Sequence, residues 1–390
     1  MIHSVLYYAL CVCIFSGFIT YISFCYRFWL GYKNYRPVIS FKKRTVSVVI
    51  VARNEAKNLN ELFLCLLNQD YPKDLYEVIL ADDDSEDDTE EVVNKYCQAG
   101  LNLIYVKSLG RDQAFSPKKQ AMEKAILQTN GEIILTTDAD CLVPITWISS
   151  MVSLFTDDVS MVAGYSRTLL PSWEKAKILH KYEHLDFAFT YMALGGGYTL
   201  GKSWACIGQN LGYSKKAFMD VGGFDKIRHL ISGDDVNLMQ LMRCQGHKII
   251  FNFLPASFVY THPVKSWKHL VNQRSRWASN MKYQLKFNPE FFFILLSMAF
   301  MYWGGILMMF FNFYLGLFIF AFRILIENIT FGFSRKTFGI SSKMMHFYPI
   351  WLVIQTFFLV FTMVLGQFNI FVWHGKRPYK RNNGHATNNL

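Results

Sequence analysis

The chain shows two kinds of hydrophobic pattern. Residues 5–30 and most positions from 291 onward are almost continuously apolar, whereas residues 45–165 alternate short apolar runs with amphipathic stretches. An apolar run of about 20 residues is long enough to cross a bilayer. The run VSVVIVA at 46–52 is short and rich in β-branched residues, as a buried parallel strand is. The pattern therefore predicts a globular middle with membrane segments at both ends.

Within the globular middle, predicted strands and helices follow one another in turn. This alternation indicates an α/β fold with a mostly parallel, Rossmann-like sheet, in which ligands bind at the carboxyl ends of the strands. Residues 166–290 are less regular, and we expect the aromatic stretch 172–198 to lie at the membrane interface. The expected strands are 46–52, 76–82, 101–108 and 131–140, and the expected helices are 58–69, 87–100 and 117–130.

Basic residues beside the apolar runs predict how the chain sits in a membrane. Five of them follow the first run between Lys33 and Arg44, and positive flanks stay in the cytoplasm, so the middle should face the cytoplasm. No cleavage site follows this run, which predicts a retained anchor. The basic residues at 335–343 and at 376–381 both favour the same inner side. A single crossing at 348–373 cannot satisfy both, so we expect this segment to be re-entrant or interfacial, or an earlier span to be miscounted.

Composition supports a membrane protein and narrows its partners. The chain is 52% hydrophobic and 17% aromatic, too apolar for a soluble protein of 390 residues. Its formal charge of +11 is largely explained by the flanks of the apolar runs, so the lipid bilayer is the expected partner and no nucleic acid is expected. The eight cysteines form no C-x-x-C pair, which favours reduced thiols over zinc or redox sites. We expect an integral protein of a bacterial inner membrane.

Two acidic clusters follow predicted strands. Asp82, Asp83 and Asp84 end the second strand, where they could cap the next helix or hydrogen-bond a base or ribose, and the residues alone leave these two readings even. Asp138 and Asp140 follow the fourth strand, and carboxylates two residues apart on an extended segment point to the same side. Two such oxygens suit Mg²⁺ or Mn²⁺, which also bind substrate phosphates. A chance polar turn is the less favoured reading of this pair.

Two further clusters come later in the chain. Asp234 and Asp235 precede a segment with helical spacing, so helix capping is the simpler interpretation, although one acid could cap while the other acts as a base. The run QRSRW at 273–277 lies in a basic amphipathic stretch, which by itself favours a helix on the membrane surface. Its guanidinium groups could also stabilise a leaving diphosphate.

Taken in order, these four clusters resemble the family 2 glycosyltransferases with a GT-A fold, over roughly residues 45–280. The departure from the family pattern is Asp84, which stands where the motif V-D-D-G-S-x-D-x-T has glycine. The resemblance implies a nucleotide-sugar donor, a divalent cation (Mg²⁺ or Mn²⁺), and roles for individual residues. By this resemblance, Asn54 and Glu55 belong to the nucleotide loop, Asp82 and Asp83 contact the nucleobase, and Lys118 is a lysine of the donor site. Asp138 and Asp140 form the D-x-D metal motif, and Asp234 and Asp235 stand at the Glu-Asp position, with Asp235 as the catalytic base. Gln273, Arg276 and Trp277 match the Q-x-x-R-W motif.

The predicted protein is thus an inverting, membrane-anchored glycosyltransferase that uses a nucleotide sugar, with UDP-sugars favoured, and a lipid or glycan acceptor. A processive polysaccharide synthase of the same family is the alternative, although the C-terminal segments are few for extruding a polymer. The expected organisation is an anchor at 1–32, a GT-A catalytic domain at 45–288, transmembrane or interfacial helices at 289–375 and a basic polar tail at 376–390.

One motif points to a different function. GGYTLGKS at 196–203 fits the phosphate-loop pattern G-x-x-x-x-G-K-S. That loop works only between a strand and a helix. The residues that follow it have no helical periodicity, so we expect no NTPase here. A pure transporter is also disfavoured, because only Glu327 is an acid near the apolar runs and the α/β middle would have no role.

Overall fold

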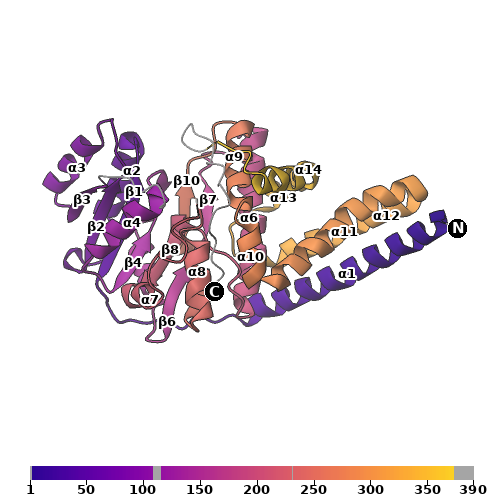
Figure 1. Ribbon diagram of the computed structural model, residues 1–390, viewed down its shortest axis with the longest axis horizontal. Helices are drawn as coiled ribbons and strands as arrows, with labels where there is room; N and C mark the ends of the chain where they lie inside the picture. The colour runs from indigo at the N-terminus through magenta and orange to yellow at the C-terminus, as the bar shows by residue number, and fades with distance from the viewer. Residues whose placement is uncertain (1, 109–115, 231, 373–390) are drawn as a thin grey trace, which may run out of the picture.

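The computed structural model describes residues 2–108, 116–230 and 232–372, and the expected tail at 376–390 lies outside them. A globular α/β part forms one end, and a bundle of long helices projects from it (Figure 1). The N-terminal end of the chain lies at the far tip of this bundle.

A seven-stranded sheet forms the centre of the globular part. Its strand order is β3-β2-β1-β4-β8-β6-β9, and the first four strands are parallel to one another. Strand β8 runs antiparallel to both of its neighbours. The predicted mostly parallel sheet is confirmed. The strands are β1 Val46–Ala52, β2 Tyr76–Asp82, β3 Leu103–Lys107, β4 Ile133–Thr136, β6 Val159–Ala163, β8 Leu211–Ser214 and β9 Lys248–Phe251.

Register places the polar loops at one edge. Ala52 at the end of β1 pairs with Asp82 at the end of β2, so the segments that follow these strands lie side by side. The strands are buried because helices cover the sheet, which is why their sequences are nearly continuously apolar. These helices are α2 Ala56–Leu67, α3 Thr89–Gln98, α4 Pro117–Leu127, α5 Trp147–Val152, α7 Lys215–Asp220 and α8 Val236–Cys244, with 3₁₀ turns at Lys73–Leu75, Gly208–Asn210 and Pro255–Ser257.

A second, small sheet and one long helix separate the main sheet from the membrane bundle. The small sheet has the order β5-β10-β7, formed by Cys141–Leu142, Val259–Thr261 and Ser166–Thr168. Helix α6 (Ile178–Thr199) packs against it, and most of the α6 residues are buried. The helix is therefore packed inside the protein, with contacts to the long helices α1 (Ile2–Asn34), α12 (Phe313–Ser334) and α14 (Tyr348–Gln367) as well as to the small sheet. The expectation that residues 172–198 lie at the membrane interface stays a prediction.

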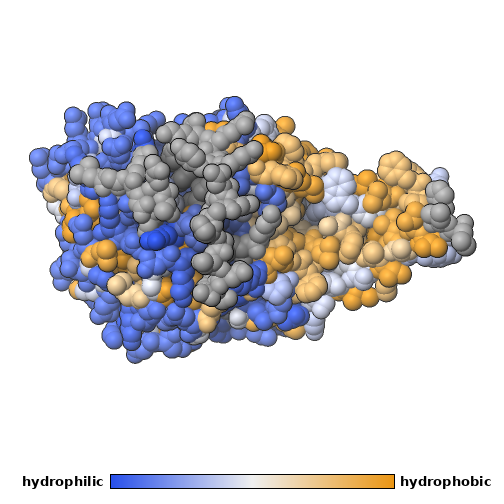
Figure 2. All heavy atoms as spheres, viewed as in Figure 1, coloured by the Kyte–Doolittle hydropathy of each residue, from blue (hydrophilic) through white to orange (hydrophobic). Residues whose placement is uncertain are grey.

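Four helices are long and apolar enough to cross a membrane, by length and composition, among the described residues. Apolar residues dominate the surface of the projecting bundle, and polar residues dominate the globular part (Figure 2). Gly17 and Gly304 let α1 and α11 approach closely, because a Cβ on Gly304 would lie 2.6 Å from the Ile14 side chain. The four helices are α1 Ile2–Asn34, α11 Pro289–Phe311, α12 Phe313–Ser334 and α14 Tyr348–Gln367; the shorter α9 Trp267–Ala278, α10 Met281–Phe287 and α13 Ser342–Met345 complete the C-terminal half.

Candidate active site

Charged side chains from three separate segments meet at the carboxyl edge of the main sheet. Lys118, in the first turn of α4, places its Nζ 3.1 Å from Asp138 Oδ1 and 3.1 Å from Asp234 Oδ2. Asp138 follows β4 and Asp234 precedes α8. Burial opposes the charge of Lys118, but Asp138 and Asp234 outweigh it and raise the pKa of this lysine. Lys118 is therefore a permanent cation between two carboxylates.

Asp235 occupies the N-cap of α8 and also hydrogen-bonds the backbone at Gly208. Its Oδ2 accepts the Gly208 N–H at 2.8 Å, and its Oδ1 accepts the Val236 N–H at 2.6 Å. Burial and the neighbouring Asp234 raise the pKa of Asp235 to about 6, against the effect of these two donors. The pKa of Asp234 changes the other way, because Lys118 and Lys119 outweigh the effect of burial and lower it. The N-cap prediction is thus confirmed for Asp235, which is also the acid poised to accept a proton near neutral pH.

Asp140 lies in the same acidic centre. Burial, together with repulsion from Asp138 and Glu55, raises the pKa of Asp140 to about 7. Glu55 itself accepts a hydrogen bond from Asn58 at 2.6 Å and follows β1. The carboxylates therefore carry more negative charge than Lys118 compensates, which is the condition that a bound cation relieves. Among the described residues, no group of three or more His, Cys, Asp or Glu side chains is arranged as a complete metal cage.

Lys119 was not singled out from the sequence, yet it anchors the loop that carries Asp234 and Asp235. Its buried Nζ donates to the Leu230 carbonyl at 2.5 Å and to the Ser232 carbonyl at 3.1 Å. Burial lowers the pKa of Lys119 to about 8, although the nearby acids oppose this change. The two neighbouring lysines therefore have different partners: Lys118 pairs with carboxylates, and Lys119 binds backbone carbonyls.

The helix α9 carries the Q-x-x-R-W residues and separates its two arginines. Arg274 donates from Nε to Asp186 of α6 at 2.9 Å, and its guanidinium lies 4.2 Å from the ring centre of Trp277. Arg276 faces the acidic centre instead: burial lowers its pKa, and Asp234, Asp138 and Asp235 oppose this effect. Gln273 accepts a hydrogen bond from Arg274 at 2.8 Å. Of the predicted residues on α9, Arg276 thus joins the acidic centre, whereas Gln273 and Trp277 contact Arg274.

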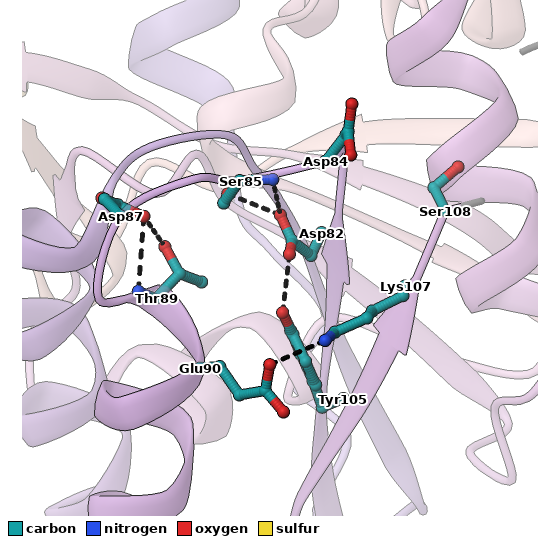
Figure 3. Close-up of a pocket in the computed structure, with 9 residues that line it drawn as sticks. All are labelled: Asp82, Asp84, Ser85, Asp87, Thr89, Glu90, Tyr105, Lys107 and Ser108. Atoms are coloured by element: carbon teal, nitrogen blue, oxygen red, sulfur yellow. Dashed lines mark hydrogen bonds and ion pairs between the residues drawn. The ribbon is translucent and has the colours of Figure 1, made fainter. Parts of the chain in front are cut away.

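A cavity of about 220 Å³ opens at the ends of β2 and β3 (Figure 3). Asp82 lines it, but its Oδ2 already accepts the Tyr105 hydroxyl at 2.6 Å and its Oδ1 accepts Ser85. Asp83, predicted with Asp82 to contact a base, is not among the lining residues and lies 4.0 Å from Arg53. The lining residues are Asp82, Asp84, Ser85, Asp87, Thr89, Glu90, Tyr105, Lys107 and Ser108.

Two loop residues beside this cavity have left-handed backbone angles. Asn54 has φ of 55° and Asp84 has φ of 65°, and asparagine and aspartate tolerate this region better than most residues. Asn54 Oδ1 accepts the Glu86 N–H at 2.7 Å, which ties the loop after β1 to the loop after β2. Asp84 therefore makes the same kind of turn that glycine would make at the family's glycine position, and the carboxylate it adds points away from Asp82 (Figure 3).

The remaining candidates lie elsewhere. The phosphate-loop match at 196–203 begins inside the last turn of α6 and follows no strand, so the expectation that it is not an NTPase loop is supported by its structure. His262 Nε2 lies 3.4 Å from Glu61 Oε2. The acidic centre and the cavity thus lie at the carboxyl ends of the parallel strands, the edge at which α/β sheets bind ligands, and Arg276 of α9 faces the acidic centre.

Comparison with known proteins shows which family the globular part resembles. Residues 47–222 match the sequence profile of glycosyl transferase family 2. A probable glycosyltransferase of Bacillus subtilis, YdaM, is 28% identical over 63% of this chain and 58% of its own length. The β-monoglucosyldiacylglycerol synthase of a Nostoc species is 28% identical over 63% of this chain, and the aligned part is 51% of that enzyme. The chain therefore matches little more than half the length of these two relatives.

A solved structure has the same fold. The mannosyltransferase of Pyrobaculum calidifontis, solved with GDP-mannose and Mn²⁺, superposes with a TM-score of 0.60 at 19% identity, covering 93% of this chain and 98% of that one. This likeness supports the predicted GT-A fold. Residues 47–222 of the chain thus resemble glycosyl transferase family 2 in sequence, and the fold agrees with this resemblance.

Proposed function

We propose that the protein transfers one sugar at a time from a nucleoside-diphosphate sugar to an acceptor at the membrane surface, with inversion at the anomeric carbon. The observation that carries this proposal is the meeting of Lys118 with Asp138 and Asp234, beside Asp235. Acids and a lysine from segments far apart in sequence converge there. The relatives support the reaction type, and the one named as a glucosyldiacylglycerol synthase supports a lipid acceptor.

Asp235 is the proposed base. With a pKa of about 6 it is largely ionised at neutral pH and can take the proton of an acceptor hydroxyl. The hydroxyl oxygen then attacks the anomeric carbon on the face opposite the departing diphosphate, which gives inversion. Asp234 is less suited to this role because its ion pair with Lys118 lowers its pKa.

Lys118 and Arg276 are the proposed cations at the leaving diphosphate. Charge builds on that group as the glycosidic bond breaks, and fixed cations stabilise it without reorganisation. Asp138 and Asp140 fit a divalent cation such as Mg²⁺ or Mn²⁺, since two hard oxygen donors leave room for phosphate oxygens and water. When bound, this cation supplies further neutralisation of the diphosphate.

The cavity at the ends of β2 and β3 is the proposed place for the nucleoside. It offers several carboxylates and the Lys107 amine, and it adjoins the loop that Asn54 ties down. UDP-sugars stay the favoured donors from the sequence, with GDP-sugars as the main competitor in the test. The domain is proposed to face the cytoplasm, where nucleotide sugars are made.

The test uses the purified protein reconstituted in membranes. UDP- and GDP-sugars are screened in the presence of Mg²⁺ or Mn²⁺, and the released nucleotide is measured. EDTA should abolish the release, and Asp140→Ala should reduce it by about 100-fold or more. Asp74→Ala is the matched control, because Asp74 is an exposed acid in the turn before β2. Release that EDTA leaves unchanged would remove the metal role, and no release from any nucleotide sugar would overturn the proposal. A ladder of long products in place of a single glycoside would show a processive synthase.

A further inference from the structure

The helix α14 is fastened to the globular part along its whole length. Near its start, the Trp351 ring lies 4.6 Å from the Phe189 ring of α6. In its middle, Gln355 accepts a hydrogen bond from the Tyr182 hydroxyl of α6. At its end, Gln367 Nε2 donates to the Ala278 carbonyl of α9 at 2.9 Å. No part of α14 is far from the domain that carries the site.

This attachment is incompatible with a transmembrane orientation. A 20-residue helix is about 30 Å long, the thickness of the hydrocarbon core, so a crossing would carry one end to the far side of the bilayer. Both ends of α14 instead contact α6 or α9. Helices α1, α11 and α12 pack mainly on one another and project away from the domain, whereas α14 packs most extensively on α9 at the base of the bundle (Figure 1).

The outer face of α14 is nevertheless apolar. Exposed apolar side chains recur every three or four residues and form one stripe, which we name the α14 stripe. The opposite face is buried against protein and includes Trp351, Leu352 and Gly366. The α14 stripe continues onto the bundle, where the Trp303 ring of α11 lies 5.5 Å from the Phe357 ring. Its members are Ile350, Val353, Phe357, Val360, Phe361, Val364 and Phe368, each at least 40% exposed.

We infer that α14 lies in the plane of the membrane surface, with the α14 stripe among the lipid acyl chains, and that the chain crosses the bilayer only with α1, α11 and α12. Lipid is the occupant because the stripe is continuous with the apolar surface of the spans. This arrangement also removes the conflict of charges. The basic residues at 335–343 and at 376–381 can both stay on the inner side when the helix between them does not cross.

The close contact with α9 gives this helix a second consequence. A Cβ on Gly366 would lie 2.5 Å from the Ser275 carbonyl oxygen, so the two helices touch backbone to backbone. Helix α9 carries Arg276, which faces the acidic centre. A bilayer that holds α14 therefore also holds α9 in place, through the contact between the two helices. If the proposed function holds, an acceptor lipid then reaches the site from the membrane surface along α9.

Topology tests the in-plane position without any assay of activity. Green fluorescent protein, which fluoresces only in the cytoplasm, and alkaline phosphatase, which is active only outside it, are fused in parallel after Asn312, Ser341 and Leu390. We expect Ser341 and Leu390 to report the same side and Asn312 the opposite side. Opposite sides at Ser341 and Leu390 would show that α14 crosses and would overturn the inference. The comparison does not depend on which side the domain faces.

Two substitutions test what the helix contacts. Gly366→Leu should lower nucleotide release about 10- to 100-fold through displacement of α9, with unchanged topology, whereas Val364→Leu on the stripe should stay near the wild-type rate. Equal rates would remove the link to α9 while leaving the fusion result intact. The oligomeric state in detergent tests the occupant of the stripe. If the wild type is a dimer and the double variant Phe357→Ser, Phe361→Ser is a monomer, the stripe binds a second copy of the chain, and the assignment to lipid is overturned.

Discussion

Replacing Asp235 by asparagine separates its chemical role from its structural one. The carboxylate accepts two backbone N–H groups, from Gly208 and Val236, and has a pKa of about 6. An amide has one oxygen, so one of these N–H groups loses its acceptor and meets an NH₂ group, which costs about 1–3 kcal/mol of stability. An amide also cannot take a proton. Loss of general-base catalysis costs about 10²- to 10⁴-fold, or about 3–5 kcal/mol of transition-state stabilisation.

The assay measures kcat and KM for nucleotide release with acceptor present, together with thermal unfolding of the same preparation. We expect kcat of Asp235→Asn to fall by about 10²- to 10⁴-fold while KM for the donor changes little, because the donor contacts remain. Asp220→Asn, at an exposed acid at the end of α7, should leave both quantities unchanged. A folded Asp235→Asn protein with the wild-type kcat would refute the base assignment, whatever its stability.

Three further outcomes follow from the same geometry. For the wild type, kcat/KM should rise as the pH rises through about 6, because the raised pKa of Asp235 leaves this base protonated and inactive below that value; a rate independent of pH between 5 and 8 would contradict it. Asp84→Gly should keep the fold, whereas Asp84→Val should lower the free energy of unfolding by about 1–2 kcal/mol, because φ of 65° strains a β-branched residue; equal unfolding temperatures would contradict the strain. Arg274→Met should cost about 3–5 kcal/mol by leaving Asp186 buried and unpaired, and adding Asp186→Asn should restore part of the loss, which a double-mutant cycle in thermal unfolding measures; a purely additive cycle would exclude the pairing.

The sheet could be predicted because its signal is local. The strands β1 and β2 are buried on both faces, so 46–52 and 76–82 have nearly continuous apolar sequences and match the observed strands to the residue. The ends of the predicted helices and of the third and fourth strands agree with the observed ends to within four residues. The burial of helix α6 could not be predicted, because its aromatic and polar residues resemble a surface helix and only tertiary packing shows that most of them are buried.

The partners of the arginines and lysines in the site could not be predicted from the sequence. Residues 274 and 276 are two positions apart on α9 and so point to different sides of the helix, which the sequence alone could have said. It could not say which side meets the acids, because that depends on Asp186 of α6, 88 residues earlier. Lys118 and Lys119 pose the same problem. The contacts of Lys119 with the carbonyls of Leu230 and Ser232 carry no sequence signal.

The choice between Asp234 and Asp235 shows what the folded structure adds. Both acids precede the same helix, and either could cap it or act as a base. Lys118 lies 3.1 Å from Asp234 and lowers its pKa, while the charge of Asp234 and burial together raise the pKa of Asp235. The pKa values of two adjacent identical groups thus move apart, downward at Asp234 through its two lysines and upward at Asp235 through burial and the charge of Asp234. Such a separation marks the division of acid and base roles. Because Asp138 shares this cation, Lys118 also connects the proposed base to the proposed metal ligands, so changes at one part of the site should be felt at the other.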